Sequence, residues 1–211
     1  MNPIDKLTEI FRTFPGIGPR QAKRFVYFLL TRNKNYIKEF TNLIEELQKE
    51  IQICSECFQY FTKGKQTSLI CPICQSRNRD ENVLMIVARD IDLENIEKSH
   101  SFNGKYFVLG GTVPILDKNP ENRIHLKELI TTIERKSTQK NLQGETLKEI
   151  ILGFSINPES EYTENIVIES LKPLINKYNL KISHLGRGLS TGTELEYSDA
   201  DTIKSALENR K

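Results

Sequence analysis

Apolar residues recur at helical spacing in the N-terminal part of the chain. Residues 3–13 carry a stripe that predicts a helix, with Asn2 as its cap and Pro3 in its first turn. Pro19 suits the first turn of a second helix, and residues 35–50 predict a third helix that completes a small helical domain. The stripe of the first helix consists of Ile4, Leu7, Ile10 and Phe11. The second helix is predicted to carry Ala22, Phe25, Val26, Leu29 and Leu30 inward, and the third carries Tyr36, Phe40, Leu43, Ile44 and Leu47 on one side.

The C-terminal part alternates between short apolar runs and helical stripes. The apolar runs predict strands at 83–87, 106–109, 149–154 and 181–185, and the stripes predict helices at 93–97, 126–133 and 162–178. Strands and helices that alternate at these lengths form parallel units with helices on both faces of the sheet. We therefore expect an α/β domain here, with any ligand or metal chemistry at the carboxyl ends of its strands.

Two glycines between the first two predicted helices indicate a tight hairpin. Gly16 and Gly18 flank Ile17 and are bracketed by prolines, which is the pattern of a helix-hairpin-helix. Such glycines let the backbone approach a phosphate, and the N–H groups at the next helix start point toward it. Positions 12 to 34 also carry no acidic residue, and their basic residues are Arg12, Arg20, Lys23, Arg24, Arg32 and Lys34.

This local charge predicts contacts to DNA that do not depend on base sequence. The alternative is a packing hairpin with a solvated basic face, as in helix-hairpin-helix units used for dimerisation, and both interpretations can hold together. The predicted DNA-binding residues are Arg12, Gly16, Gly18, Arg20, Lys23 and Arg24.

All four cysteines of the chain lie in one short segment. They form two Cys-x-x-Cys pairs, Cys54 with Cys57 and Cys71 with Cys74, and 13 residues separate the pairs. Two such pairs at this spacing predict a tetrahedral zinc site. Four thiolates leave no open coordination position, so we expect the zinc to be structural and not to activate water.

Disulfides are the alternative use of these cysteines. A lysine-rich chain without a secretory signal favours a reducing compartment, and therefore favours zinc. The segment around the cysteines is poor in apolar residues, so metal binding would supply its folding energy. We expect this segment to join the helical part to the sheet.

Composition limits the remaining function classes. The 211 residues include 30 basic and 28 acidic ones, a net charge of +2, so any basic site must be local. No apolar run approaches the ~18 residues of a membrane span, and the N-terminus does not resemble a signal peptide, so we expect a soluble, cytoplasmic protein with no membrane partner. The chain has no P-loop frame, and its histidines are isolated, at His100, His125 and His184.

The segment from Gly186 to Asp199 is glycine-rich and polar, with the sequence GRGLSTGTELEYSD. From its composition alone it is a long surface loop. The chain combines this segment with the paired cysteines and the string YFVLGG at 106–111. With these features the chain closely resembles the RecR family of bacterial recombination mediators, over essentially its full length.

The resemblance implies a Toprim domain for the sheet region. It implies a mediator of RecFOR-type recombinational repair, which helps to load RecA on single-stranded gaps. It also implies dimers or ring-shaped tetramers that can encircle DNA, with RecO and RecF as partners. On this chain the domains become 1–52, a helix-hairpin-helix domain for DNA binding or dimerisation; 53–80, a four-cysteine zinc finger; 81–178, the Toprim domain; and 179–211, a C-terminal segment.

Site residues follow from the same resemblance. The basic hairpin positions fall on Arg20, Lys23 and Arg24, and the zinc ligands fall on the four cysteines. The glycine-rich tail becomes a contact with partner proteins or other subunits. Its candidate partner-binding residues are Gly186, Arg187, Gly188, Glu194, Glu196, Tyr197 and Asp199.

One departure from the family pattern bears on catalysis. A Toprim sheet presents a glutamate after its first strand, and this chain has Ala88 there. Glu159-Ser160-Glu161 stands where the family has Glu-Gly-Glu, and Asp90 and Asp92 resemble a magnesium pair, although carboxylates at such positions more often cap the following helix. We therefore expect no enzyme. The alternatives are a magnesium-dependent nuclease or topoisomerase-like enzyme, and a zinc-ribbon adaptor that binds only proteins.

Overall fold

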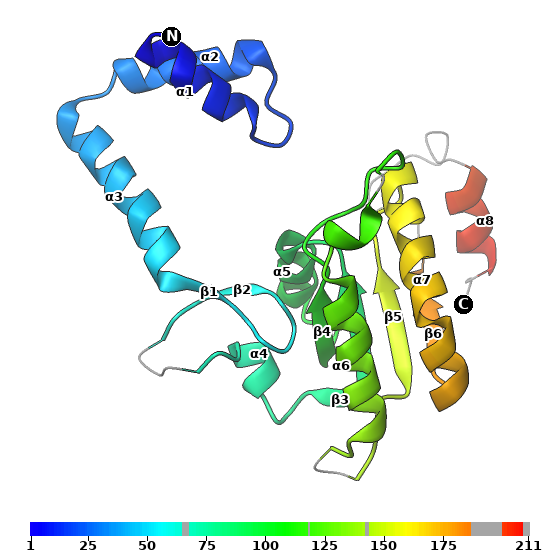
Figure 1. Cartoon of the computed structure of the whole chain (residues 1–211). Helices are drawn as coiled ribbons and strands as arrows, with labels where there is room; N and C mark the ends of the chain where they lie inside the picture. Colours follow the sequence, from blue (N-terminus) through cyan, green and yellow to red (C-terminus); the bar gives the residue numbers. More distant parts are fainter. Residues whose placement is uncertain (65–67, 118, 142–143, 187–199, 209–211) are drawn as a thin grey trace. The chain divides into compact units, whose positions relative to one another are not determined.

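The computed structural model describes residues 1–64, 68–117, 119–141, 144–186 and 200–208. The chain divides into two compact units, Met1–Ile51 and Gln52–Lys211 (Figure 1). The predicted fold class is confirmed: the first unit is a helix-hairpin-helix with a third helix, and the second holds the cysteine cluster and a parallel sheet with flanking helices. The further division at 80 and 178 stays a prediction.

The first unit contains three helices: α1 (Pro3–Arg12), α2 (Pro19–Leu30) and α3 (Lys34–Glu50). Asparagine side chains cap two of them. The Oδ1 atom of Asn2 accepts a hydrogen bond from Asp5 N at 2.9 Å, and that of Asn33 accepts one from Tyr36 N at 2.9 Å. Pro3 and Pro19 each occupy the first turn of a helix, where a missing N–H costs nothing.

Burial in the first unit is slight. Ala22 and Val26 of α2 are its buried apolar residues, and Phe11 makes edge contacts with Phe14 and Phe25. The structure describes every residue of α3, and none of them is buried. The apolar stripe predicted on one side of α3 therefore lies at the surface of the unit. Its exposed members are Tyr36, Phe40, Leu43, Ile44 and Leu47. On α2, the prediction that Leu30 faces inward is wrong, because Leu30 is 62% exposed.

The second unit begins with the cysteine segment. Strands β1 (Ile51–Ile53) and β2 (Tyr60–Thr62) pair with each other, and the first cysteine pair lies in the turn between them. The second pair belongs to the short helix α4 (Pro72–Gln75), for which Cys71 is the N-terminal cap. Each pair thus sits in its own tight turn of backbone.

Four parallel strands form the main sheet of the second unit, in the order β4-β3-β5-β6. Each overlaps one of the predicted strands. Their bounds are β3 (Asp80–Val87), β4 (Gly104–Val108), β5 (Glu149–Gly153) and β6 (Lys181–His184).

Helices cover both faces of this sheet (Figure 1). Leu84 and Ile86 of β3 face a large core with α6 (Leu126–Thr138) and α7 (Pro158–Tyr178), while Met85 and Val87 face a smaller core with α5. This alternation follows from the period of two in a strand. The other helices are α5 (Asp90–Ser99), the 3₁₀ turn η1 (Pro120–Asn122) and α8 (Ala200–Glu208).

Helix α5 is longer than the predicted helix at 93–97, and it begins at Asp90. The Asp92 carboxylate accepts a hydrogen bond from Arg89 N at 3.0 Å, which satisfies a donor at the helix start. None of the helices in the described part of the chain combines the length and apolar character needed to cross a membrane.

Candidate metal centre and nucleic-acid interface

The four cysteine sulfurs lie together in the second unit. The Sγ atoms of Cys54, Cys57, Cys71 and Cys74 are all within 4.8 Å of one another. Cys57 Sγ and Cys71 Sγ are 3.6 Å apart. Two sulfurs bound to one zinc lie ~3.8 Å apart in a tetrahedron with ~2.3 Å bonds, so the cluster has the size of a zinc tetrathiolate.

Backbone N–H groups point at the sulfurs of this cluster. Cys54 Sγ accepts from Glu56 N at 3.4 Å and from Cys71 N at 3.3 Å, and Cys71 Sγ accepts from Cys74 N at 3.4 Å. Hydrogen bonds from the Cys57 and Cys71 thiols hold the pKa of Cys54 well below its usual range, and the bond with Cys54 raises the pKa of Cys57. The backbone donors favour the thiolate form of Cys54 and Cys71, and the thiolate is the form that binds metal.

The cysteine segment is bonded to the edge of the main sheet. Val108 N of β4 donates to Cys57 O at 2.8 Å, and the Asp90 carboxylate accepts from Tyr60 N at 2.7 Å. A salt bridge of 2.6 Å joins Arg135 of α6 to Glu56 between the first two cysteines. The metal site and the sheet therefore belong to one framework.

Lys105 of β4 also joins the cysteine segment to the main sheet, and the sequence pattern does not single this residue out. Its side chain is 4% exposed, and its Nζ donates to carbonyl oxygens in the second cysteine turn, of which Ser76 O is nearest at 2.8 Å. A lysine just before an apolar run is typical of an exposed strand end. Its partners are backbone atoms, which leave no trace in a side-chain pattern.

The hairpin of the first unit is open around its glycines. Gly16 has φ +75°, a conformation that favours glycine, and a Cβ at Gly16 or Gly18 would have no atom within 4 Å in the described structure. Ile17 N donates to Phe14 O at 3.1 Å, which closes the turn. Gly18 precedes α2, whose start receives no side-chain cap from the described residues. The first N–H groups of α2 can therefore receive an anion.

Basic side chains surround this helix start. Arg20, Lys23 and Arg24 are exposed on α2, three and four residues apart, while Ala22 and Val26 face the interior. The structure thus brings the predicted basic positions together at one end of α2. Arg12 differs from them, because its guanidinium pairs with Glu9 at 2.8 Å.

The carboxylates at the carboxyl ends of the strands make structural bonds. Asp90 binds the backbone of Tyr60, Asp92 caps α5, and the Glu159 carboxylate accepts from Thr112 Oγ1 at 2.6 Å. Ala88 is buried. Among the described residues, the four cysteines are the group of at least three acidic, histidine or cysteine side chains close enough to share one ion.

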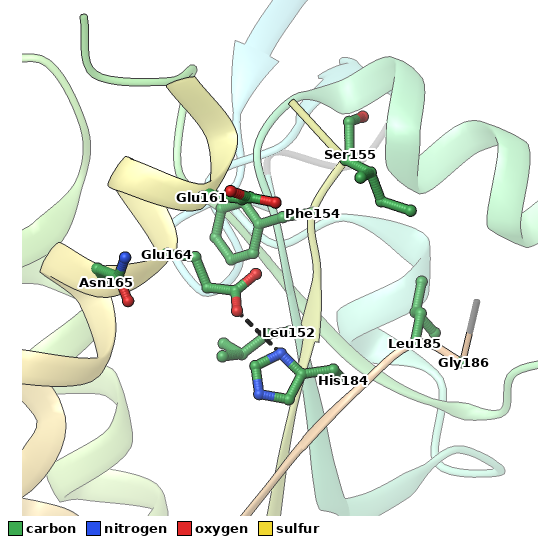
Figure 2. Close-up of a pocket in the computed structure, with 10 residues that line it drawn as sticks. Leu152, Phe154, Ser155, Glu161, Glu164, Asn165, His184, Leu185 and Gly186 are labelled. Atoms are coloured by element: carbon green, nitrogen blue, oxygen red, sulfur yellow. Dashed lines mark ion pairs between the residues drawn. The ribbon is translucent and has the colours of Figure 1, made fainter. Parts of the chain in front are cut away.

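A pocket of about 450 Å³ opens at the carboxyl ends of β5 and β6, the side of the sheet where the sequence predicts any ligand chemistry (Figure 2). Glu164 Oε1 and His184 Nδ1 lie 2.9 Å apart in its lining (the dashed line in Figure 2). Gly186, exposed at the end of its lining, is the described member of the predicted partner-binding residues. The others lie outside the described residues: Arg187, Gly188, Glu194, Glu196, Tyr197 and Asp199.

Two family models match the chain. The model described as "RecR, helix-hairpin-helix" matches residues 4–48, which hold all three helices of the first unit except their outermost residues. The model described as "RecR, C-terminal" matches residues 188–211.

Curated relatives align along the whole chain. Recombination protein RecR of Legionella pneumophila subsp. pneumophila (strain Philadelphia 1) is 36% identical over 210 residues, which cover 100% of this chain and 96% of that protein. The proteins of the same name from Rippkaea orientalis and Cyanothece sp. are 31% and 29% identical over 209 residues, with 99% of this chain covered. The alignments cover 96% and 95% of those two proteins.

Proposed function

The chain belongs to the RecR family of recombination proteins, and from this membership we propose that it is a non-catalytic DNA-binding mediator of RecFOR-type repair. In this role it acts in the cytoplasm and helps to load RecA on single-stranded gaps as a ring-shaped clamp. Three parts of the chain share the work: the hairpin contacts DNA, the cysteine cluster holds structural zinc, and the tail contacts other proteins.

The hairpin carries the proposal. Its open glycines and uncapped helix start offer backbone donors to a phosphate, next to the exposed cations Arg20, Lys23 and Arg24. None of these features selects a base, since phosphate contacts position a protein without reading sequence. The interface therefore suits a mediator that binds gaps wherever they form.

Zinc suits the four cysteines, because their mutual distances and N–H donors match a tetrathiolate. Bound by Cys54, Cys57, Cys71 and Cys74, the ion supplies cross-linking of the two turns. The salt bridge of Glu56 and the backbone bond of Cys57 pass this rigidity to the sheet.

Self-association would cover the exposed apolar stripe of α3. The other described residues of the first unit leave this stripe exposed, which favours a second copy in a closed ring, since exposed apolar patches mark interaction sites. RecO and RecF are the proposed partners of the tail, through Gly186, Arg187, Gly188, Glu194, Glu196, Tyr197 and Asp199.

A lack of catalysis fits the carboxyl edge of the sheet. Ala88 replaces a carboxylate, and Asp90, Asp92 and Glu159 hold the backbone or a neighbouring hydroxyl. A magnesium-dependent phosphoryl-transfer site needs carboxylates that converge on the ion. Incubation with supercoiled plasmid and magnesium should leave the plasmid intact, whereas nicking that vanishes on Asp90→Asn would favour the nuclease.

DNA binding is tested by band-shift titration with duplexes of several unrelated sequences and with single strands. The wild type should bind the different sequences about equally. The double variant Lys23→Ala with Arg24→Ala should bind all of them more weakly. A control removes the same charge from exposed positions of the second unit, Lys127→Ala with Lys140→Ala, and should bind as the wild type does. Equal binding by the hairpin variant would place the DNA contact elsewhere, whereas no binding by the wild type would leave the zinc-ribbon adaptor as the better interpretation.

A further inference from the structure

Lys105 is an unusual residue for its place in the fold. It lies in β4, where all five residues are buried, and its side chain is 4% exposed. Lysine is among the residues least often buried, because its charge loses hydration when it leaves water. A buried lysine therefore requires partners that compensate for this loss.

Three backbone carbonyl groups receive its ammonium. Lys105 Nζ donates to Ile73 O at 3.3 Å, to Cys74 O at 3.0 Å and to Ser76 O at 2.8 Å. These carbonyls lie at the end of α4, where a helix leaves its last acceptors unsatisfied. All three donors of the ammonium are thus used on the turn that carries the last metal-binding cysteine.

The carboxylate nearest to Lys105 does not explain the buried charge. Glu81 lies 4.0 Å away and is 37% exposed, so it is a distant and solvated partner. The Lys105 ammonium instead donates to the carbonyl oxygen of Cys74 at 3.0 Å, and Cys74 belongs to the cysteine cluster. The positive charge of Lys105 therefore lies beside the group that becomes negative when its thiols bind a metal.

Four thiolates and one divalent cation carry a net charge of −2, much of it buried with the cluster. We propose that Lys105 is a positioning residue of the metal centre: it fixes the backbone of the second cysteine turn and supplies a buried positive charge that offsets the charge of the metal-bound thiolates. This inference rests on the proposed zinc site and adds a residue from the sheet to it.

Three substitutions separate the charge from the hydrogen bonds. Lys105→Arg keeps the charge and the donors, Lys105→Gln keeps donors without charge, and Lys105→Met keeps neither. Substitution of a residue that holds a metal ligand in place typically lowers the metal affinity by 10–100-fold. We expect zinc to leave the Gln variant ~10-fold faster than the wild type and the Met variant faster still, whereas the Arg variant restores most of the retention.

The experiment measures zinc transfer from the purified full-length protein to a chromogenic chelator, with alkylation of the cysteines followed in parallel. Lys148→Gln is the matched control, because Lys148 is an exposed lysine of the same unit whose ammonium pairs with Glu145 at 2.5 Å. It should release zinc at the wild-type rate. Cobalt substitution adds a spectroscopic readout, since the thiolate-to-cobalt absorption should shift in the Gln variant and not in the control.

The outcomes distinguish this inference from the zinc site itself. Wild-type protein without stoichiometric metal would contradict the zinc site and Lys105 together. A metal-loaded wild type with equal release from the Gln variant would contradict Lys105 alone. If the Met variant does not fold, the Gln and Arg variants still decide. If the Gln variant is also unstable, its stability loss is compared with and without metal: a loss that is equal in both forms would contradict the role of the charge.

Discussion

The two units of the chain differ in how much of themselves they bury. In the first unit, which the structure describes in full, Ala22 and Val26 are the buried apolar residues. The sheet unit instead surrounds its strands with a large core on one face and a smaller one on the other. The cysteine segment of the second unit is a third case, because thiols make up its buried cluster.

These differences fit the tasks that we propose for the two units. Phosphate binding needs exposed cations and open backbone, and self-association needs an exposed apolar face; the first unit has both on its surface. The sheet unit buries its apolar residues in two cores, one on each face of the sheet. The buried cluster of the cysteine segment is made of thiols, and we propose that a metal takes the place of an apolar core there. Substitutions that remove the stabilising feature of one region at a time test this comparison.

Loss of the metal should have the largest effect. In Cys71→Ser three sulfurs cannot close the tetrahedron, and metal binding is worth on the order of 10–16 kcal/mol in small zinc-dependent folds. We expect the variant to lose zinc and to become sensitive to proteases near residues 52–79, while the main sheet stays folded. Metal analysis and limited proteolysis check this. A variant that keeps one zinc per chain would contradict the assignment of Cys71.

Truncation of the sheet core should have the next largest effect. Leu129 of α6 is fully buried, so Leu129→Ala should destabilise the second unit by about 2–5 kcal/mol. Because the two units have separate cores, hydrogen exchange should rise in β3 and α6 and stay unchanged in α1 and α2. Equal acceleration in both units would show that they unfold together.

The apolar stripe of α3 should govern assembly. Phe40→Ser with Leu47→Ser removes two exposed side chains, each worth about 1.5–3 kcal/mol if a second copy buries it. We expect light scattering to show a lower assembly mass, with the melting of the second unit unchanged. The control Glu39→Ser with Glu46→Ser changes exposed polar positions of the same helix. An unchanged mass in the first variant would place the subunit contact elsewhere.

A single helix cap should have the smallest effect. Asn33→Ala removes the acceptor for Tyr36 N and should cost ~1 kcal/mol, expressed as fraying of α3. Asn157, whose Oδ1 accepts from Ser160 N at 2.9 Å, is the matched cap of α7. Since α7 packs on the sheet core, Asn157→Ala should cause less fraying than Asn33→Ala. Hydrogen-exchange rates in the first turns of α3 and α7 measure this fraying. Equal fraying of the two helices would contradict the difference in burial that we draw between the units.

Periodicity was sufficient for much of the fold. The apolar run at 83–87 predicts β3 because a strand buried on both faces has few polar positions, and the cysteine spacing predicts the cluster because few other structures need it. Strands β1 and β2 were missed, since three residues are too few for a period. The start of α5 depended on the bond between Asp92 and the backbone of Arg89.

Two features of the candidate sites lay beyond sequence patterns. The α3 stripe has the spacing of a packed helix, but spacing does not say whether the same chain or another covers it. Lys105 binds carbonyl groups about thirty residues away in the chain, and backbone acceptors are the same for every residue type. The sequence pattern marked the turn correctly at Gly16, whose φ of +75° favours glycine, whereas Gly18 has an extended backbone that other residues can adopt.

The central claim is that the first unit holds DNA through its hairpin, by phosphates alone. The most direct test is the affinity for one DNA fragment at several salt concentrations, for the wild type and for Lys23→Ala with Arg24→Ala. Each neutralised phosphate releases counterions, so the variant should bind more weakly and its log–log salt slope should flatten by up to ~2 units. The same affinity and slope in a folded, zinc-loaded variant would mean that DNA is held elsewhere and would contradict the claim.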